Sequence, residues 1–316
     1  MDLRDRLSLE HLILQAGFAG GLAGADLAAA VSGAGALGTV GLVGARALRA
    51  EIRRARELAP GRPVAVNLLM PFVRRAHVDV CVEERVTAAV LFFGHSRSFV
   101  SRLREAGVFV LHQVGTPAEA RRALRDGADA LIAQGLEAGG HLLGVQPALA
   151  ALARVREVAD EAPVFAAGGI ADSAAVRAAL SAGASGVLCG SRFLLTHESR
   201  AIPGYKARVL GAERTVVTTL FGFGWPARHR VVPNAATERW GSGGVLTRMS
   251  GFAGRLLPMS AGARLSRMQR LSVPLYSPMV PTEERLLDVS PLYAGECVRE
   301  IRDVLPAAQV VRELVG

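Results

Sequence analysis

The feature that most constrains this chain is a repeated unit in its first two hundred residues or so: a short apolar run, a glycine-rich turn and an amphipathic stretch. Eight apolar runs share this setting: 12–16, 37–41, 64–68, 88–93, 108–114, 130–134, 164–167 and 186–189. Continuous rather than alternating apolar runs indicate strands covered on both faces, and hence a parallel sheet wrapped by helices. Eight units favour an α/β fold closed into a (β/α)8 TIM barrel, with an open doubly wound sheet as the alternative.

The stretches between these runs carry helix signals at both ends. Helices are predicted at 26–34, 47–58, 98–106, 117–126, 147–159 and 173–181. Thr116 stands before Pro117 as an expected N-cap, and Asp172 or Ser173 is expected to cap a later helix. Three helices are expected to end in a left-handed glycine, at Gly107, Gly127 and Gly183.

Beyond residue 202 the pattern changes. The chain passes from an extended segment expected at 214–220 to a loop-rich stretch at 221–262, weak helical character at 263–271 and an apolar-periodic piece at 293–315. We therefore predict a barrel domain over 1–202, a cap subdomain for substrate over 203–290, and a C-terminal segment, 291–316, whose helix packs back on the barrel.

The charge balance raises the question of nucleic-acid binding, because the formal net charge is +9 and the pI is about 10.7. Lys206 is the only lysine, and the arginines are scattered singly, as at Arg46, Arg49, Arg53, Arg54 and Arg56. Only 5% of residues are aromatic, and no dense basic tract is present. We therefore expect a solvated arginine-rich surface and no nucleic-acid partner, with some attraction to acidic substrates or phosphates left open.

Cysteine usage and the N-terminus bear on the compartment. Cys81, Cys189 and Cys297 lie far apart without Cys-x-x-Cys spacing, which argues against a disulfide framework or a zinc site and fits a reducing cytoplasm. Residues 1–10 lack the layout of a signal peptide, and no apolar stretch reaches the roughly 18 residues of a membrane span. We expect a cytoplasmic protein with no membrane and no metal.

Two glycine-rich strand ends predict a phosphate site. Ala167, Gly168 and Gly169 follow the seventh apolar run, and Gly190 and Ser191 follow the eighth. In (β/α)8 barrels the loops after these two strands commonly bind phosphate through backbone N–H groups and a helix N-terminus. The alternative is that these glycines only make tight turns, but two such loops at adjacent strand ends favour the phosphate.

A third glycine-rich loop, Gly139-Gly140-His141, follows the sixth run. Two glycines let the backbone lie flat against a planar ligand, and the imidazole can transfer a proton near neutral pH. His141 is therefore the catalytic candidate, and His112, inside the fifth run, is a weaker candidate for a pocket residue. The other five histidines are interpreted as structural: His11, His77, His95, His197 and His229.

Two amides lie in otherwise apolar runs. Asn67 is near the end of the third run and Gln134 ends the sixth. A buried amide without partners is costly, so we expect each to meet a polar ring edge or the backbone.

With these motifs in order, the chain resembles the nitronate monooxygenase family, formerly called 2-nitropropane dioxygenases, which includes the flavin-dependent enoyl-acyl-carrier-protein reductases. The resemblance covers most of the sequence. Its pieces are LILQAGFAGGLAGADLAAAVSGAGALG at 12–38, PVAVNLLMPF at 63–72, GADALIAQGLEAGGH at 127–141, PVFAAGGIADSAAVRAALSAGASGVLCGSRFLLTHES at 163–199, TVVTTLFGFGWPAR at 215–228 and LYAGECVREIRDVLPAAQVVREL at 292–314.

The resemblance implies an FMN-dependent oxidoreductase with FMN across the barrel mouth. It assigns the cofactor to Gln15, Ala16, Gly17, Phe18, Asn67, Gln134, Gly139, Gly140, Ala167, Gly168, Gly169, Gly190 and Ser191. It makes His141 the catalytic or substrate-orienting residue for an alkyl nitronate or nitroalkane oxidised with O2. The alternative on the same scaffold is an NAD(P)H-dependent reductase of quinones or enoyl thioesters. Outside catalysis, a flavin-binding regulatory protein is the remaining hypothesis, and homodimer formation stays open.

The chain departs from the family pattern at four places. Phe18 stands where a methionine is usual, and Ser191 replaces a threonine while keeping its hydroxyl. The turn after His141, Leu142-Leu143-Gly144, is one residue longer, and Trp225 replaces an arginine. These departures affect the expected substrate more than the expected cofactor.

Overall fold

All eight predicted strands are present in the computed structural model, which describes residues 2–18, 20–241 and 267–316. Their bounds are β1 (Ile13–Gln15), β2 (Gly38–Val40), β3 (Val64–Leu69), β4 (Ala88–Phe92), β5 (Phe109–Val114), β6 (Ala130–Gln134), β8 (Val164–Ala167) and β9 (Gly186–Cys189). They pair in parallel in the order β1-β9-β8-β6-β5-β4-β3-β2. The N–H of Leu37 donates to the carbonyl of Ile13 at 2.9 Å and the N–H of Gln15 donates to that of Leu37 at 3.0 Å, which joins β1 to β2 and completes the ring. The predicted TIM barrel is confirmed, and the open sheet is wrong.

The chain divides into two compact units. The first comprises Met1–Leu136, Leu143–Arg200 and Val304–Gly316, and contains the barrel. The second comprises Glu137–Leu142 and Ala201–Asp303. Relative to the boundaries predicted after residues 202 and 290, this division gives 137–142, 201–202 and 291–303 to the second unit.

The barrel interior is filled by side chains that alternate along the strands. Leu14, Leu111, Ile132 and Phe165 belong to one buried cluster with Leu7 and Leu9. The last two extend this core from α1 (Leu3–Leu7) and the residues after it, and they cluster with Phe109, the first residue of β5. The N-terminal ends of the strands are therefore covered, and the C-terminal ends are left for chemistry.

Helices cover the outside of the barrel. They are α2 (Ala25–Gly33), α3 (Ala45–Leu58), α4 (Arg75–Glu83), α5 (Arg97–Glu105), α6 (Pro117–Asp126), α7 (Ala148–Arg156) and α8 (Ser173–Ser181), with shorter η1 (Met70–Phe72) and α9 (Ser191–Leu194) at strand ends. Thr116 accepts a hydrogen bond from the N–H of Glu119, as expected of an N-cap. At α8 the cap is Asp172 rather than Ser173, because its carboxylate accepts from the N–H of Ala175 at 2.7 Å.

The helix C-termini follow the glycine prediction. Gly127 is the left-handed C-cap of α6 with φ 100°. Gly107 and Gly183 have φ 79° and 89° and lie one residue beyond the C-caps of α5 and α8. Glycine adopts this conformation without the steric cost that a Cβ atom would bring.

The apolar-periodic piece at 293–315 is not one helix. It contains the end of β12 (Leu292–Tyr293), the 3-10 helix η3 (Glu296–Glu300) and α14 (Ala307–Val315). Pro306 disfavours helical backbone at the residue before it, so the long helix starts only at Ala307, whose N–H donates to the carboxylate of Glu198 at 2.9 Å. α14 packs against α2 and α8 on the outside of the barrel.

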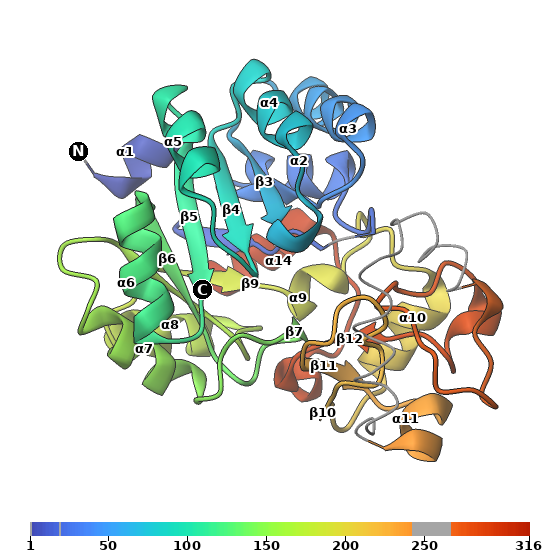
Figure 1. Ribbon diagram of the computed structural model, residues 1–316. Helices are drawn as coiled ribbons and strands as arrows, with labels where there is room; N and C mark the ends of the chain where they lie inside the picture. The colour runs from blue at the N-terminus through green and yellow to red at the C-terminus, as the bar shows by residue number, and fades with distance from the viewer. Residues whose placement is uncertain (1, 19, 242–266) are drawn as a thin grey trace. The chain divides into compact units, whose positions relative to one another are not determined.

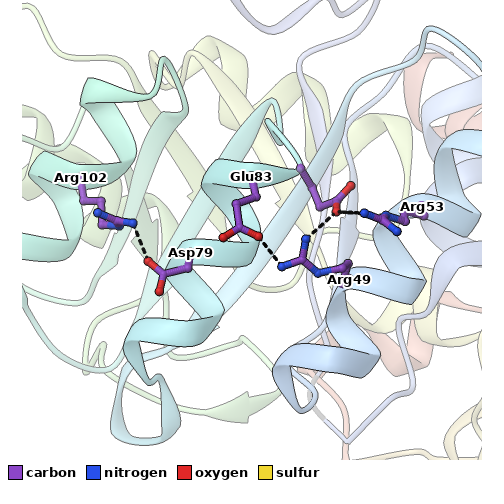
Figure 2. Close-up of polar contacts among 6 residues, drawn as sticks. Arg49, Arg53, Asp79, Glu83 and Arg102 are labelled. Carbon is purple, nitrogen blue, oxygen red and sulfur yellow. Dashed lines mark hydrogen bonds and ion pairs between the residues drawn. The ribbon is translucent and has the colours of Figure 1, made fainter.

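Two arginines of α3 form ion pairs with acidic side chains at the C-terminal end of α4 (Figure 2). Arg49 pairs with Glu83 and Glu84, and Arg53 pairs with Glu84 at 2.9 Å. Arg102 of α5 binds Asp79 of α4 at 2.7 Å. Figure 1 shows α3, α4 and α5 in this order along one side of the barrel. The charges of these three arginines are therefore matched by carboxylates.

The second unit is built on an antiparallel sheet. β11 (His229–Val232) pairs with β10 (Val216–Thr218), with β12 and with β7 (Gly140–His141). The expected extended segment at 214–220 is confirmed as β10. Among its described residues this unit also contains α10 (Pro203–Leu210), α11 (Ala235–Trp240), η2 (Glu284–Leu286) and the 3-10 helix η3, with a core that includes Phe221, Val231 and Tyr276.

The loop-rich stretch expected at 221–262 thus contains a strand and a helix, β11 and α11. Of the helix expected at 263–271, residues 263–266 lie outside the described residues, 267–268 are helical, and 269–271 are not. Within the ranges that the structure describes, no helix has the length and apolar character required to cross a membrane.

Candidate active site

The two glycine-rich loops predicted to bind phosphate leave neighbouring strands. β8 and β9 are adjacent in the barrel, and Gly168 and Gly169, directly after β8, have φ 118° and 74°. Those backbone angles favour glycine over any residue with a side chain. Gly190 follows β9 and precedes α9, which begins at the buried Ser191. The structure thus brings the two loops to one sector of the barrel mouth.

The space beside Gly190 connects the end of β9 to the end of β1. A Cβ atom added to Gly190 would lie 3.9 Å from Cβ of Ala16 and 4.0 Å from Cε1 of Phe18, which are ordinary contacts. The φ of Gly190 is −106°, outside the left-handed region that favours glycine. This glycine is therefore not demanded by packing, and a methyl group placed there would occupy free space between the predicted cofactor residues.

Two other predicted cofactor residues hold the ends of β1 and β3 together. The Nδ2 atom of Asn67 donates to the carbonyl of Gly17 at 2.7 Å. A Cβ atom on Gly17 would lie only 2.4 Å from Cβ of Asn67, which no relaxed structure permits. Asn67 therefore finds the backbone partner that a buried amide requires, and Gly17 is fixed by close packing.

Two of the predicted cofactor residues are buried glutamines that form hydrogen bonds with nearby backbone groups. Oε1 of Gln15, which is fully buried, accepts from the N–H of Thr39 at 2.8 Å, and its Nε2 donates to the carbonyl of Ala16. Oε1 of Gln134 accepts from the N–H of Leu143 at 2.7 Å. Gln134 thus anchors the lengthened turn that follows the histidine loop. Ala167, the last residue of β8, is buried in the barrel interior.

His141 lies in the second unit and is enclosed by aromatic rings of that unit. The indole of Trp225 stacks on its imidazole, with ring centroids 3.6 Å apart and planes inclined by 11°. The rings of His229 and Tyr293 lie at 5.2 and 5.3 Å. The side chain is buried, and burial, followed by repulsion from His229, lowers the pKa of His141 well below the ordinary value. The imidazole is neutral at physiological pH.

His229 and Tyr293, whose rings lie beside His141, are uncharged at neutral pH as well. Nδ1 of His229 lies 3.0 Å from the carbonyl of Ala227, and the N–H of Phe221 donates to Nε2 at 3.4 Å. A neutral ring protonated at Nδ1 satisfies both contacts. Burial lowers the pKa of His229 to about 4, and burial raises the pKa of Tyr293, whose hydroxyl donates to the carbonyl of Pro278 at 2.9 Å.

The glycines before His141 serve different purposes. A Cβ atom on Gly139 would lie 2.5 Å from the carbonyl carbon of Ala294 and from the nitrogen of Gly295, so this glycine is required by packing inside the second unit. Gly140 has φ 77°, and a Cβ atom there would meet nothing within 4 Å. Of the two glycines, only Gly140 has open space beside its backbone. The expectation that both glycines lie against a planar ligand is therefore reduced to Gly140.

His112 is brought to a different place. Its neighbours in β5, Phe109 and Leu111, belong to the barrel-interior cluster, and alternation puts His112 on the helix-covered face. Its ring lies 4.5 Å from that of His95, whose Nδ1 atom is 3.5 Å from a carboxylate oxygen of Asp126. Burial, followed by the charge of His95, lowers the pKa of His112 to about 4. Its side chain does not belong to the barrel interior.

The sequence alone does not predict which aromatic residues surround His141. Trp225 stood out as a departure from the family pattern, but nothing local linked it to His141, and His229 was interpreted as structural. The structure confirms that His229 is buried and hydrogen-bonded, and it adds that the ring lies beside His141. Within the described ranges, no group of three or more His, Cys, Asp or Glu side chains is arranged to hold a metal ion.

A closed (β/α)8 barrel with glycine-rich loops on neighbouring strands and a histidine loop leading into an antiparallel unit is the architecture of an α/β-barrel enzyme. The model of the nitronate monooxygenase family matches residues 3–76 and 70–316. The chain belongs to this family, and it is an oxidoreductase.

Relatives and solved structures agree with this assignment. A dehydrogenase of Mycobacterium tuberculosis, named for (3aS,4S,5R,7aS)-5-hydroxy-7a-methyl-1-oxo-octahydro-1H-indene-4-carboxyl-CoA, is 35% identical over 84% of this chain and 74% of its own. The nitronate monooxygenase of Pseudomonas aeruginosa is 36% identical over 67% of this chain and 74% of its own. The nitroalkane oxidase of Streptomyces ansochromogenes superposes with a TM-score of 0.80 at 30% identity, covering 99% of this chain and 96% of that one.

Proposed function

We propose that this protein is an FMN-dependent oxidoreductase of the nitronate monooxygenase type, which oxidises alkyl nitronates or nitroalkanes with O2. The observation that carries the proposal is the pair of glycine-rich loops, Gly168-Gly169 and Gly190-Ser191, at the ends of adjacent strands. Backbone N–H groups of such loops bind phosphate in (β/α)8 barrels. The family supports a flavin as the group that carries this phosphate.

The residues present fit such a cofactor. Gly190 leaves room for a ligand beside Ala16 and Phe18, Asn67 lies in the second half of β3, and Gln134 is the last residue of β6. Phosphate would be held by the two glycine-rich loops, and the ring system by the ends of β1, β3 and β6. When bound, FMN supplies the redox chemistry by taking electrons from the substrate and passing them to O2.

His141 is the proposed acid–base residue. A neutral imidazole accepts a proton from a neutral nitroalkane, whose C–H bond electrons then delocalise onto the nitro group. A nitronate is already deprotonated, so its oxidation does not require this step. Gly140, whose backbone faces open space, is proposed as the place where a planar ligand approaches the histidine loop.

FMN binding tests the carrying observation. Gly190→Ala adds a methyl group that the protein itself accommodates, so the apoprotein is expected to keep its melting temperature while the Kd for FMN rises at least about tenfold, or about 1.4 kcal/mol. The matched control is Gly33→Ala, at an exposed helix position where a Cβ atom meets nothing within 4 Å, and it is expected to leave the Kd unchanged. A colourless protein that does not take up FMN would refute the cofactor.

Activity tests the reaction. Oxygen consumption is expected with propyl-1-nitronate and with 1-nitropropane, and His141→Ala is expected to abolish only the second. Purified enzyme that binds FMN but consumes no oxygen with either compound would refute the monooxygenase function while leaving the cofactor in place.

A second function is favoured by one specific observation: the M. tuberculosis relative is named as a dehydrogenase of a carboxyl-CoA compound. On this alternative the protein is an NAD(P)H-dependent flavin enzyme acting on quinones or enoyl thioesters. Anaerobic mixing with NADPH separates the two functions. Rapid bleaching of the flavin absorbance near about 450 nm, as for any flavin, supports the reductase, and an unchanged spectrum supports the monooxygenase.

A further inference from the structure

The contact that distinguishes the surroundings of His141 is its stacking on Trp225. The two rings are nearly parallel, 3.6 Å apart, so one whole face of the imidazole is covered by the indole. The His229 and Tyr293 rings, at 5.2 and 5.3 Å, are inclined by 55° and 50° and limit the remaining directions. A ring held in this way has a fixed plane, and its nitrogens have fixed directions.

The backbone around this stack is equally constrained. β7 pairs with β11, with His141 opposite His229, and the N–H of Leu142 donates to the carbonyl of Arg228 at 2.8 Å. Gly139 packs against the backbone of Ala294, which follows β12. The imidazole is therefore held by its own strand and covered by Trp225 from the turn before β11.

From this geometry we propose that Trp225 is a positioning residue for His141, and that the stack makes His141 a proton acceptor for uncharged carbon acids rather than a cationic anchor for anionic substrates. The inference rests on the proposed acid–base role of His141. In the step, a C–H bond next to a nitro or thioester carbonyl group breaks, the proton forms an N–H bond with the imidazole, and the electron pair moves onto the nitro or carbonyl oxygen.

The electrostatic surroundings agree with this role. The rings of Trp225, His229 and Tyr293 lie around the imidazole, and burial keeps the last two uncharged at neutral pH. The nearest cation along β11, Arg230, pairs with Glu296 at 2.8 Å, and its register partner is Gly140 rather than His141. Glu137, at the start of the histidine segment, contributes a further negative charge near Arg230. None of the three rings around His141 supplies a positive charge for a nitronate or carboxylate.

Trp225 has two opposing effects on the pKa of His141, so measuring that pKa without the indole tests the inference. An indole face attracts a cation, which on its own raises the pKa of an imidazole. The same indole excludes water, which lowers the pKa, and burial is the larger effect here. Removing the indole is therefore expected to raise the pKa of His141 toward its ordinary value, whereas a dominant cation–π effect would lower it.

The experiment is an NMR titration of the FMN-loaded and FMN-free protein with 13C-labelled histidine, in which the His141 signal is assigned by its loss in His141→Gln. Wild-type His141 is expected to titrate well below the ordinary range of histidine, and in Trp225→Ala its pKa is expected to rise by at least about one unit toward that range. The matched control uses the other tryptophan, Trp240, which lies in the same unit and donates to the carbonyl of Leu271. Trp240→Ala is expected to leave the His141 titration unchanged. An unchanged pKa in Trp225→Ala, or an equal shift in Trp240→Ala, overturns the positioning role.

Kinetics test the substrate class. Trp225→Ala is expected to lower kcat/KM for 1-nitropropane at least about tenfold, since acid–base catalysis depends on a fixed donor–acceptor geometry, and to change kcat/KM for propyl-1-nitronate by less than about threefold. Trp225→Arg is a second variant for the case that alanine does not fold. Its permanent charge is expected to shift the kcat/KM ratio toward the nitronate by at least about tenfold.

Equal losses for both substrates in these variants overturn the substrate-class inference. The outcome is distinguishable from a failure of the proposed function. If the enzyme binds FMN but oxidises neither substrate, the proposed function falls, while the NMR titration still decides whether Trp225 controls the protonation of His141.

Discussion

The barrel is expected to lose stability in mild acid because His112 is buried without charge. The ordinary pKa of 6.5 applies to this side chain when the chain is unfolded, whereas burial lowers it to about 4 in the folded protein. Between these values the unfolded chain binds the proton more tightly than the folded chain. The free energy of unfolding therefore falls as the pH drops below about 6.5, and this contribution levels off below about 4.

The magnitude follows from the two pKa values. The difference of about 2.5 units corresponds to a loss of about 3 kcal/mol once the pH is below about 4, and to about 2 kcal/mol at pH 5. No discount for solvent is needed, because His112 is 1% exposed. The neighbouring His95 and Asp126 remain in place when only His112 is changed.

Urea unfolding of apoprotein at pH 7.5 and pH 5, compared between wild type and His112→Gln, measures this contribution. The glutamine is uncharged at both values, so the variant is expected to lose about 2 kcal/mol less than wild type between them. The comparison uses the change in the free energy of unfolding between pH 7.5 and pH 5, and not the stability of the variant at pH 7.5 alone. If the two proteins lose the same free energy within about 0.5 kcal/mol, a value in the range of additive errors, then His112 does not carry a depressed pKa and the reasoning is refuted.

Two further predictions concern packing and charge. Gly17→Ala is expected to destabilise the protein by about 1–3 kcal/mol, because its Cβ atom collides with Asn67, whereas Gly33→Ala is expected to be neutral or slightly stabilising; thermal unfolding checks both, and equal melting temperatures would contradict the clash. Glu84→Gln removes the ion pairs of Glu84 with Arg49 and Arg53. It is expected to lower the free energy of unfolding by at most about 1 kcal/mol at low salt and by less at about 1 M salt. A loss that does not depend on salt would show that packing, not charge, is the cause.

Much of the barrel was predictable from local patterns. The strand bounds agree with the apolar runs to within one residue, as at β6 (Ala130–Gln134), because a strand covered on both faces leaves a continuous apolar run in the sequence. Caps such as Thr116 and Gly127 were predictable for the same local reason: capping depends on one side chain or one backbone angle. The extent of the last helix was less predictable, because apolar periodicity continues through a segment that Pro306 interrupts.

The second unit shows where local reasoning ends. β11 and α11 lie in a stretch whose glycines and prolines indicated loops. β11 forms there because it pairs with β10, its neighbour along the chain, and with β7 and β12 from distant parts of the sequence. Pairing with distant strands stabilises a segment that has little preference of its own. Gly139 of the histidine loop is also explained only by the folded structure, because its close contact with Ala294 leaves no room for a side chain.

The sequence by itself determined the barrel, the two glycine-rich loops at adjacent strand ends and the candidacy of His141, since each is encoded in a few consecutive residues. Only the tertiary structure decided the state of that histidine. Trp225, His229 and Tyr293 are far from it in the chain and are brought to it by the pairing of β7, β11 and β12. Burial among uncharged rings sets the protonation of an imidazole, and burial is a property of the folded chain rather than of any local pattern.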